Sequence, residues 1–337
     1  MSRPLILAIE TSCDETAVAL VHGNDLVTSE VASQTALHQP FGGVVPEAAS
    51  RSHLAKIKPL LDRTLATAGV APGAIDAVAA TRGPGLLTAL LVGLAAGKGL
   101  AIGLNRPFIG VNHLEGHLLS PFFDAAAGPV RSVGLVVSGG HTLLVLLEKV
   151  GDYRLVGRTV DDAAGEAFDK VARLIGLPYP GGPEIDRLAR KGDPTRYRLP
   201  RSMPGGSNFQ FSFSGLKTAV RYLLPQLSGD FQADLAASFQ EAVVDVLVRK
   251  TLAAARAHNC EVVGVSGGVS CNSRLRDRME KACAAAGVTL NLARTDLTTD
   301  NAAMIGFAAV QRLQQGLIDD LGVDADPSLP LTVTGNG

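Results

Sequence analysis

The run Val133-Gly-Leu-Val-Val-Ser-Gly-Gly-His-Thr-Leu-Leu-Val-Leu-Leu147 decides the fold. Two apolar stretches, 133–137 and 143–147, flank five small or polar residues, which predicts a strand, a tight turn and a returning strand. Glycine lets such a turn bring its backbone N–H groups close to a phosphate oxygen. One turn of this kind is weak evidence for a nucleotide site, because glycine turns are common.

Related patterns occur twice more in the chain. Residues 5–10 are apolar up to Glu10, residues 11–16 form an acidic, hydroxyl-rich turn, and residues 17–21 predict a returning strand. A third apolar run, 262–265, leads into Ser266-Gly-Gly-Val-Ser270 and then a helical segment. The repetition predicts an α/β protein with a duplicated domain that closes on a nucleotide.

Composition sets the limits for this prediction. The 337 residues are enough for two domains, and 46% hydrophobic residues exclude a disordered chain. A net charge of -1 gives no general attraction to nucleic acid, so RNA binding requires a local basic patch. Four cysteines form no Cys-x-x-Cys pair, and the N-terminus has no signal-peptide pattern, so we expect a cytoplasmic protein.

The segment 86–104 is long and apolar enough to suggest a membrane span, with Lys98 as its one charge. Its four glycines and the strand-like runs on either side favour a buried helix of the α/β core instead. We therefore expect no membrane association.

His113-Leu-Glu-Gly-His117 follows an apolar run, 107–111, that predicts a buried strand. On a helix the two imidazoles at i and i+4 share one face and can bind a metal, while Glu115 points away. The metalloprotease order is H-E-x-x-H, so this order does not fit protease chemistry. The alternative is a helix with one exposed and one core histidine.

Asp300 precedes a predicted helix, so it is either an N-cap or a third metal ligand. Two histidines and one carboxylate suit Fe(II), Zn or Mn. Further along, Asp162, Glu166 and Asp169 are predicted to share a helix face, which is either solvated or accepts hydrogen bonds from a ligand. The most basic stretch, 187–201, is either a solvated loop or the contact with an RNA backbone. The stretch 203–213 is predicted to be mobile.

Ten motifs resemble one family from about residue 5 to residue 312. They are Glu10–Thr16, Gly42–Glu47, Gly83–Gly85, His113–His117, Val137–Thr142, Asp161–Lys170, Tyr179–Pro183, Phe211–Lys217, Gly267–Ser270 and Thr299–Asn301. The chain is similar to the bacterial tRNA adenosine threonylcarbamoyltransferases, also known as glycoproteases or O-sialoglycoprotein endopeptidases.

The resemblance implies the α/β actin/Hsp70/sugar-kinase (ASKHA) fold, with two duplicated lobes around a nucleotide-binding cleft. We expect residues 1–129 to form the N-terminal lobe, joined by a returning C-terminal helix at 300–325. Residues 130–299 would form the C-terminal lobe, and 326–337 a tail.

The implied reaction transfers a threonylcarbamoyl group from threonylcarbamoyl-AMP to the exocyclic amine of an adenosine in tRNA. That adenosine lies just 3′ of the anticodon in tRNAs that read codons starting with A. The implied partners are an inactive paralogue of the same fold, as a heterodimer, and a small P-loop ATPase.

The resemblance also assigns residues. The expected ligands of one divalent metal, most often Fe(2+) with Zn(2+) as the alternative, are His113, His117 and Asp300. The expected acyl-adenylate contacts are Val136, Val137, Ser138, Gly139, Gly140, Asp169, Gly182, Asp186 and Asn272. Asp14 and Glu15 on the first turn are expected to orient or deprotonate the amine, unless they only cap backbone groups of a hairpin.

Three other functions compete with this one. A kinase of the same fold would transfer the γ-phosphoryl group of ATP to a small molecule. A metalloprotease is disfavoured by the position of Glu115. A non-catalytic scaffold would carry no metal.

Overall fold

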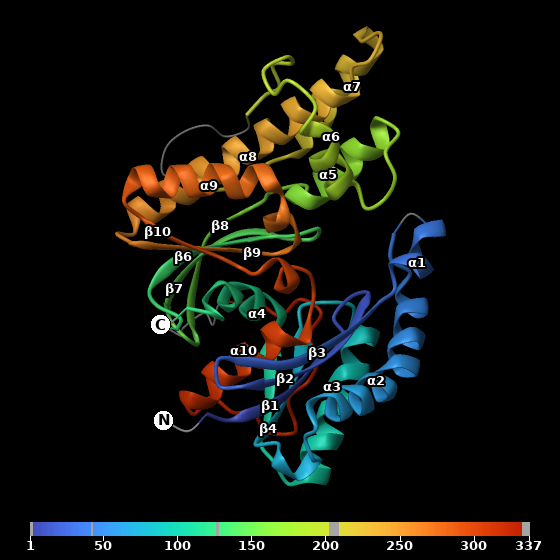
Figure 1. The fold of residues 1–337 in the computed structure, drawn as a ribbon, viewed down its shortest axis with the longest axis vertical. Coiled ribbons are helices and arrows are strands. Elements are labelled where there is room, and N and C mark those ends of the chain that lie inside the picture. The colour runs from blue at the N-terminus through green and yellow to red at the C-terminus, as the bar shows by residue number, and fades with distance from the viewer. Residues whose placement is uncertain (1–2, 42, 126–127, 202–208, 332–337) are drawn as a thin grey trace. The chain divides into compact units, whose positions relative to one another are not determined.

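The computed structural model describes residues 3–41, 43–125, 128–201 and 209–331, coloured by position in Figure 1. The chain divides into two compact units. Unit 1 contains the chain up to residue 129, a short segment at 149–153 and the chain from residue 299 on. Unit 2 contains residues 130–148 and 154–298, so the expected lobe boundaries differ at 149–153 and at residue 299.

Unit 1 is built on a five-stranded sheet in the order β3-β2-β1-β4-β5. Its strands are β1 (Leu5–Glu10), β2 (Glu15–His22), β3 (Asp25–Ser33), β4 (Ala77–Gly83) and β5 (Phe108–Asn112). The first three strands pair antiparallel, whereas β1, β4 and β5 pair parallel. Strands β1 and β4 are almost wholly buried, as apolar runs without alternation predict for a sheet covered on both faces.

Helices cover both faces of this sheet. Helices α2 (Pro46–Ala68) and α3 (Leu87–Leu104) pack on one face, and α10 (Ala302–Gln314) with α4 (His113–Leu119) packs on the other (Figure 1). The remaining helical turns are α1 (Thr35–His38), η1 (Gln39–Phe41), η2 (Pro72–Ala74) and η3 (Ser120–Phe122). The segment that resembles a membrane span is α3, which is long and apolar enough but packs against β4 and α2 as a core helix does.

Unit 2 is built on a second five-stranded sheet, in the order β10-β9-β6-β7-β8. Its strands are β6 (Ser132–Val137), β7 (Thr142–Lys149), β8 (Asp152–Arg158), β9 (Val262–Ser266) and β10 (Thr289–Leu292). Strands β6 and β7 pair antiparallel, and β6, β9 and β10 pair parallel. Read from the other edge, this order repeats that of unit 1, so the described sheets have the duplicated topology that the sequence predicted.

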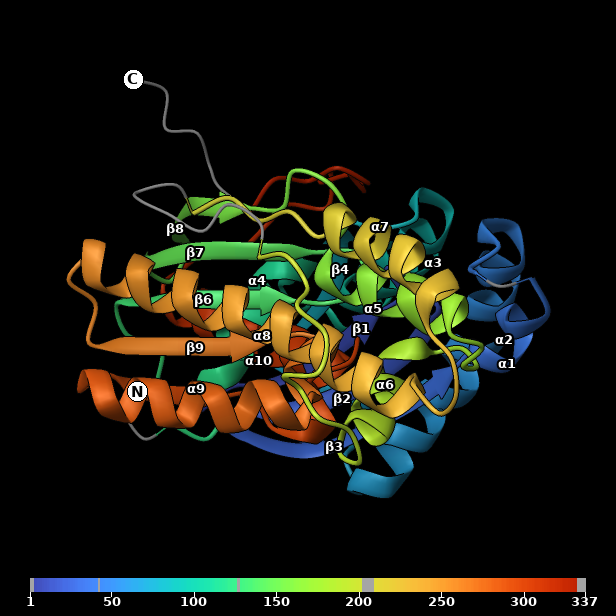
Figure 2. The ribbon, with the colours of Figure 1, turned by 90° about the horizontal axis from the view of Figure 1, so that it is seen from above.

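The helices of unit 2 include α8 (Gln232–Ala257) and α9 (Ser273–Ala286), which lie along one face of the sheet (Figure 2). Helices α5 (Ala164–Leu174), α6 (Gly181–Ala189) and α7 (Ser214–Leu223) pack beside them. Short 3-10 turns are η4 (Leu224–Gln226), η5 (Gly268–Cys271) and η6 (Thr295–Leu297). One continuous apolar core joins the sheet to α5, α6, α7, α8 and α9.

Two expectations about the C-terminus are wrong in detail. The returning helix covers 302–314 rather than 300–325, because Gly316 has a φ of 71° and the chain then turns toward β5. Part of the expected tail is also bound to unit 1. The backbone N–H of Asp326 donates to Arg82 O at 2.8 Å, and the Asn112 amide donates to Pro330 O at 3.1 Å.

Candidate functional site

Helix α4 starts directly where strand β5 ends. Asn112 closes the strand and caps the helix, since its side-chain oxygen accepts a hydrogen bond from Leu114 N at 2.9 Å. Every residue of α4 is buried, and the helix packs against α10. Gly116 allows this close approach, because a Cβ there would lie 2.9 Å from Ile305 Cδ1. The positions of His113 and His117 are therefore fixed by the core of unit 1.

The structure brings the three expected metal ligands together. The Nε2 atoms of His113 and His117 lie 3.4 and 3.2 Å from the same carboxylate oxygen of Asp300. Asp300 is not the N-cap of α10, because Asn301 fills that role by accepting a hydrogen bond from Met304 N at 2.8 Å. The carboxylate of Asp300 is thus available to the imidazoles. The alternative prediction, a helix with one exposed and one core histidine, is wrong, since both histidines are buried.

The donor set fits a divalent cation. One ligand atom from each residue lies within 4.8 Å of the others, and two ligands about 2.1 Å from one ion are separated by roughly 3.0–3.4 Å. His117 Nδ1 is buried and has no hydrogen-bond partner among the described residues. Two imidazole nitrogens, once His113 has released its proton, and one carboxylate oxygen are ligands that Fe(II), Zn and Mn all accept.

A second set of polar groups contacts the other ring nitrogen of His113, Nδ1. Its Nδ1 lies 3.1 Å from Glu10 Oε2 and 3.1 Å from Ser12 Oγ. Glu10 is fully buried and also accepts a hydrogen bond from Thr81 Oγ1 at 2.7 Å. A carboxylate behind a histidine orients the ring and leaves the other nitrogen for a ligand. Sequence reasoning assigned no role to Glu10; a charged residue closing a buried strand is the signal that could have found it.

The electrostatics of this cluster favour a positive charge on His113 and a negative charge on Asp300. Burial alone would lower the pKa of His113, but Asp300 and Glu10 raise it well above its ordinary value. Burial would raise the pKa of Asp300, but His113 and His117 hold it well below its ordinary value. The Asp300 carboxylate is therefore ionised, as a metal ligand must be.

The acidic turn lies beside this cluster, with Ser12 as the direct link to His113. Burial, Asp14 and Asp300 raise the pKa of Glu15 to about 9, although Ser33 Oγ donates to its carboxylate at 3.0 Å. The structure therefore places Asp14 and Glu15 on the turn that adjoins the trio, and Glu15 holds its proton at neutral pH.

Unit 2 presents the glycine turn between β6 and β7. Ser138 N donates to His141 O at 2.8 Å and closes the turn. Gly139 and Gly140 are exposed, and among the described residues their N–H groups have no acceptor. Val136 and Val137 are buried in the preceding strand and contribute backbone rather than side chains to the surface.

Two further glycines hold this turn in place. A Cβ at Gly165 would lie 2.6 Å from Ser138 O, so α5 packs directly on the turn. Gly267 has a φ of 88°, and a Cβ there would lie 2.4 Å from Val137 O. Sequence reasoning did not assign these glycines, because the close contacts join segments far apart in the chain.

The other expected acyl-adenylate residues lie on α5, on α6 and at the start of α9. Asp169 Oδ1 accepts a hydrogen bond from Gly181 N at 2.7 Å, next to Gly182. Asp186 accepts from Ser273 Oγ at 2.8 Å. Asn272 caps α9 by accepting from Leu275 N at 3.0 Å and donates to Gln240 Oε1 at 2.6 Å. Asp162, by contrast, precedes α5 and pairs with Lys170 at 2.7 Å, so it does not share the helix face.

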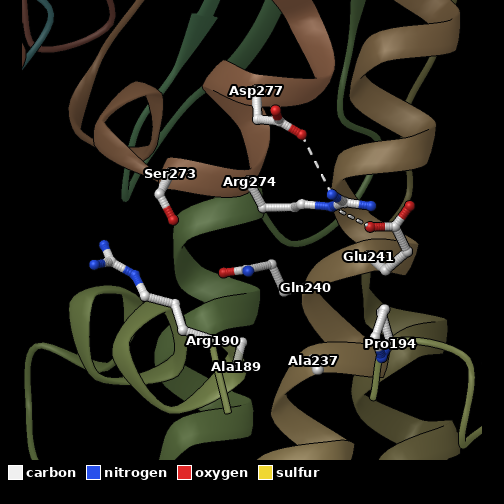
Figure 3. Close-up of a pocket in the computed structure, with 9 residues that line it drawn as sticks. All are labelled: Ala189, Arg190, Pro194, Ala237, Gln240, Glu241, Ser273, Arg274 and Asp277. Carbon is white, nitrogen blue, oxygen red and sulfur yellow. Dashed lines mark hydrogen bonds and ion pairs between the residues drawn. The ribbon is translucent and has the colours of Figure 1, made fainter. Parts of the chain in front are cut away.

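A pocket of about 300 Å³ opens between α6, α8 and α9 (Figure 3). Two of its lining residues form hydrogen bonds to the expected contacts, Ser273 to Asp186 and Gln240 to Asn272. Arg274 crosses it and pairs with Glu241 at 2.7 Å and with Asp277 at 3.3 Å. The other lining residues are Ala189, Arg190, Pro194, Ala237, Gln240 and Ser273. The pocket is large enough for a planar heterocycle next to the groups expected to hold a ribose.

The basic stretch is partly neutralised. Arg187 pairs with Glu184 at 2.6 Å, and Arg201 pairs with Asp245 at 3.5 Å. Arg196 and Arg198 are exposed. Residues 202–208 lie outside the described part of the chain, so the expected mobile loop at 203–213 falls largely there.

The family model for tRNA N6-adenosine threonylcarbamoyltransferase matches residues 25–307. A protein of that name from Methylibium petroleiphilum is 51% identical and covers 97% of each chain. Another from Pelobacter propionicus is 49% identical and covers 99% of each chain.

A solved structure, HypF of T. kodakarensis, superposes with a TM-score of 0.64 at 14% identity, covering 93% of this chain and 48% of that one. This likeness concerns the fold alone, and with the duplicated sheets it confirms the expected ASKHA fold. On the family match and the near-complete coverage of its relatives, the chain belongs to the tRNA N6-adenosine threonylcarbamoyltransferase family.

Proposed function

We propose that this transferase takes the threonylcarbamoyl group from threonylcarbamoyl-AMP. The acceptor is the exocyclic N6 amine of the adenosine 3′ of the anticodon in tRNAs that read A-starting codons. The match to the family model over residues 25–307 carries the proposal. The chemistry requires an activated donor, because the lone pair of an adenine amine is delocalised into the ring.

Unit 2 binds the donor in this proposal. The exposed N–H groups of Gly139 and Gly140 bind the phosphate, and Asp169, Gly182 and Asp186 hold the ribose. The adenine enters the 300 Å³ pocket that adjoins Asn272. Backbone N–H groups fixed by close packing are suited to a phosphate whose negative charge grows as it leaves.

Unit 1 acts on the acyl group and the amine. His113, His117 and Asp300 hold one divalent ion, Fe(2+) or alternatively Zn(2+), which supplies Lewis-acid polarisation of a carbonyl or phosphoryl oxygen when bound. The N6 lone pair forms the bond to the carbamoyl carbon, the bond from that carbon to the phosphate oxygen breaks, and AMP leaves with the electron pair. Asp14 takes the proton from N6. Glu15, whose pKa of about 9 keeps it protonated, donates a hydrogen bond that orients the acceptor.

The proposed partners are a paralogue of the same fold, which would form a heterodimer with this chain, and a small P-loop ATPase. Exposed apolar side chains on unit 1 support a protein partner there: Phe41 is 69% exposed, Leu54 is 70% exposed and Leu91 is 48% exposed. Ser50 Oγ donates to Thr88 Oγ1 at 2.6 Å and joins the helices that carry Leu54 and Leu91. We also propose that the enzyme works in the cytoplasm, together with its tRNA substrate.

The competing functions receive no support. None of the reported relatives is named as a kinase or a protease. Glu115 is committed to Tyr153 and Arg312, so it does not face the trio as a protease base must. The compact trio also argues against a scaffold without metal.

The decisive test is mass spectrometry of tRNA nucleosides after incubation with threonylcarbamoyl-AMP and the proposed partners. We expect threonylcarbamoyladenosine to appear at the position 3′ of the anticodon. Transfer of labelled γ-phosphoryl from ATP to a small molecule, with no modified adenosine, would overturn the proposal.

A further inference from the structure

Glu115 lies between the two histidines in sequence, but its carboxylate is buried on the opposite side of α4. Tyr153 Oη donates to Glu115 Oε1 at 2.7 Å, and Arg312 Nη1 lies 3.3 Å from Oε2. The Glu115 side chain is only 2% exposed. A charge in this position is costly unless its partners hold it.

Arg312 belongs to the last turn of α10, the helix that Asp300 precedes. The Glu115–Arg312 pair therefore joins the two elements that carry the trio: α4 with both histidines, and α10 with Asp300 at its start. The helices also pack together at Gly116, where an added Cβ would lie 2.9 Å from Ile305 Cδ1 and 3.2 Å from Met304 Cγ. The Glu115–Arg312 ion pair adds a directional polar contact to this apolar packing.

The network continues back to the strand that leads into α4. Arg312 Nη2 lies 3.6 Å from Asp319 Oδ2, and that oxygen accepts a hydrogen bond from Gly110 N at 2.9 Å. Asp319 N donates to Phe108 O at 3.1 Å. The contacts thus form a closed circuit from β5 through α4 to α10 and back to β5.

We propose that Glu115 is a positioning residue, which with Arg312 fixes helix α4 against α10 and so sets the separation of both histidines from Asp300. The inference rests on the proposed function, in which that trio holds a divalent ion. Glu115 touches neither the ion nor the substrate. Its effect is exerted through the orientation of the helix that carries His113 and His117.

The alternative is that the pair merely stabilises unit 1. Buried ion pairs are poor stabilisers compared with apolar residues of the same size, so stability alone is a weak reason for one here. The two roles differ in what they change. A positioning role alters metal affinity beyond any loss of stability, whereas a purely structural role alters both to the extent that the fold loosens.

The experiment compares Glu115→Gln with Ile57→Val in the full chain. Glutamine keeps an acceptor for Tyr153 but turns an amide toward the Arg312 guanidinium. Ile57 belongs to the core on the other face of the sheet, so its substitution lowers stability without contacting α4 or α10. Metal-free protein is titrated with Zn²⁺ against a competing chelator, and thermal unfolding of the metal-free protein is measured in parallel. We expect Glu115→Gln to weaken Zn²⁺ binding about 10- to 100-fold, as loss of groups behind metal ligands does, and Ile57→Val to leave it unchanged.

Two outcomes would overturn the inference alone. One is wild-type affinity in Glu115→Gln, and the other is an equal loss of affinity in Ile57→Val. A different result would instead contradict the proposed metal centre itself: Zn²⁺ binding by the wild-type chain that does not depend on Asp300, as judged by an Asp300→Asn variant. If Glu115→Gln does not fold, Arg312→Lys replaces it, because lysine keeps a charge near Glu115 but cannot also reach Asp319. Its unchanged affinity would overturn the inference equally.

Discussion

The β1–β2 turn of unit 1 and the β6–β7 turn of unit 2 occupy the same place in two sheets of the same strand order. Their chemistry is opposite. Residues 10–16 present buried or half-buried carboxylates and buried hydroxyls, whereas 138–142 present glycine backbone. In the proposed function, one turn acts through its side chains and the other through its exposed N–H groups. The duplicated scaffold would then separate two tasks between two turns of the same position.

The difference lies in electrostatics. Asp14 and Asp300 repel a further negative charge at Glu15, so an anion is disfavoured at the first turn and a cation is favoured. The second turn carries no acidic side chain, and its N–H groups attract an anion. Substitutions that change charge should therefore act mainly in unit 1, and substitutions that change shape should act mainly in unit 2.

The largest expected effect is at Asp300. Asp300→Asn keeps the shape but removes the charge that both histidines face, so we expect loss of bound metal and at least a ~1000-fold loss of transfer, the scale on which removal of an essential electrostatic group acts. Metal analysis and nucleoside mass spectrometry of the same preparation check this. Full activity with unchanged metal content would contradict the proposal that unit 1 binds the cation.

The second prediction contrasts two glycines of unit 2. Gly165→Ala puts a methyl group 2.6 Å from Ser138 O and should distort the turn, lowering stability by about 1–3 kcal/mol and raising KM for the acyl-adenylate. Gly140→Ala meets nothing within 4 Å, so the fold should be unchanged while the methyl group intrudes on the phosphate. Thermal unfolding and donor titrations separate the two effects. Equal stability of both variants would contradict the packing argument.

Residue patterns were sufficient for the strands that flank the two turns, because buried strands are apolar over their whole length. Strand β1 begins and ends where the sequence predicted, at Leu5 and Glu10. The patterns also identified His113 and His117 as candidate metal ligands, since their spacing is a local property of a helix. The sequence left two roles open for Asp300, helix N-cap or metal ligand, and only the capping by Asn301 decides between them.

What the sequence could not predict is contact between distant segments. Glu10 meets His113 across 103 positions, and Arg312 meets Glu115 across 197. The end of α10 was also missed, although Gly316, which has a φ of 71°, is the kind of residue that ends a helix. These contacts depend on which face each element buries, and a local pattern does not contain that information.

The smallest expected effect concerns Glu15 and the pH dependence of stability. Its folded pKa of about 9 lies above the ordinary value of 4.5, so below pH 4.5 both states are protonated and no stability is lost. Between pH 4.5 and 9 the unfolded chain ionises while the folded chain keeps its proton, so stability falls as pH rises. Glu15→Gln removes this loss. Since Glu15 is partly exposed and screened, we expect the variant to gain about 1–2 kcal/mol at pH 8.5 and nothing near pH 4.5.

Thermal unfolding of metal-free protein across this range measures the gain. Glu148→Gln is the control, because Arg131 holds the pKa of that exposed carboxylate below its ordinary value and no gain with rising pH is expected. Addition of Zn²⁺ should shrink the difference between Glu15→Gln and wild type, since a cation beside Asp300 offsets the part that this carboxylate adds, after burial and Asp14, to the raised pKa of Glu15. A gain in the stability of Glu15→Gln that is independent of both pH and Zn²⁺ would show that the charge of the trio does not control the first turn. The two turns would then differ in shape alone.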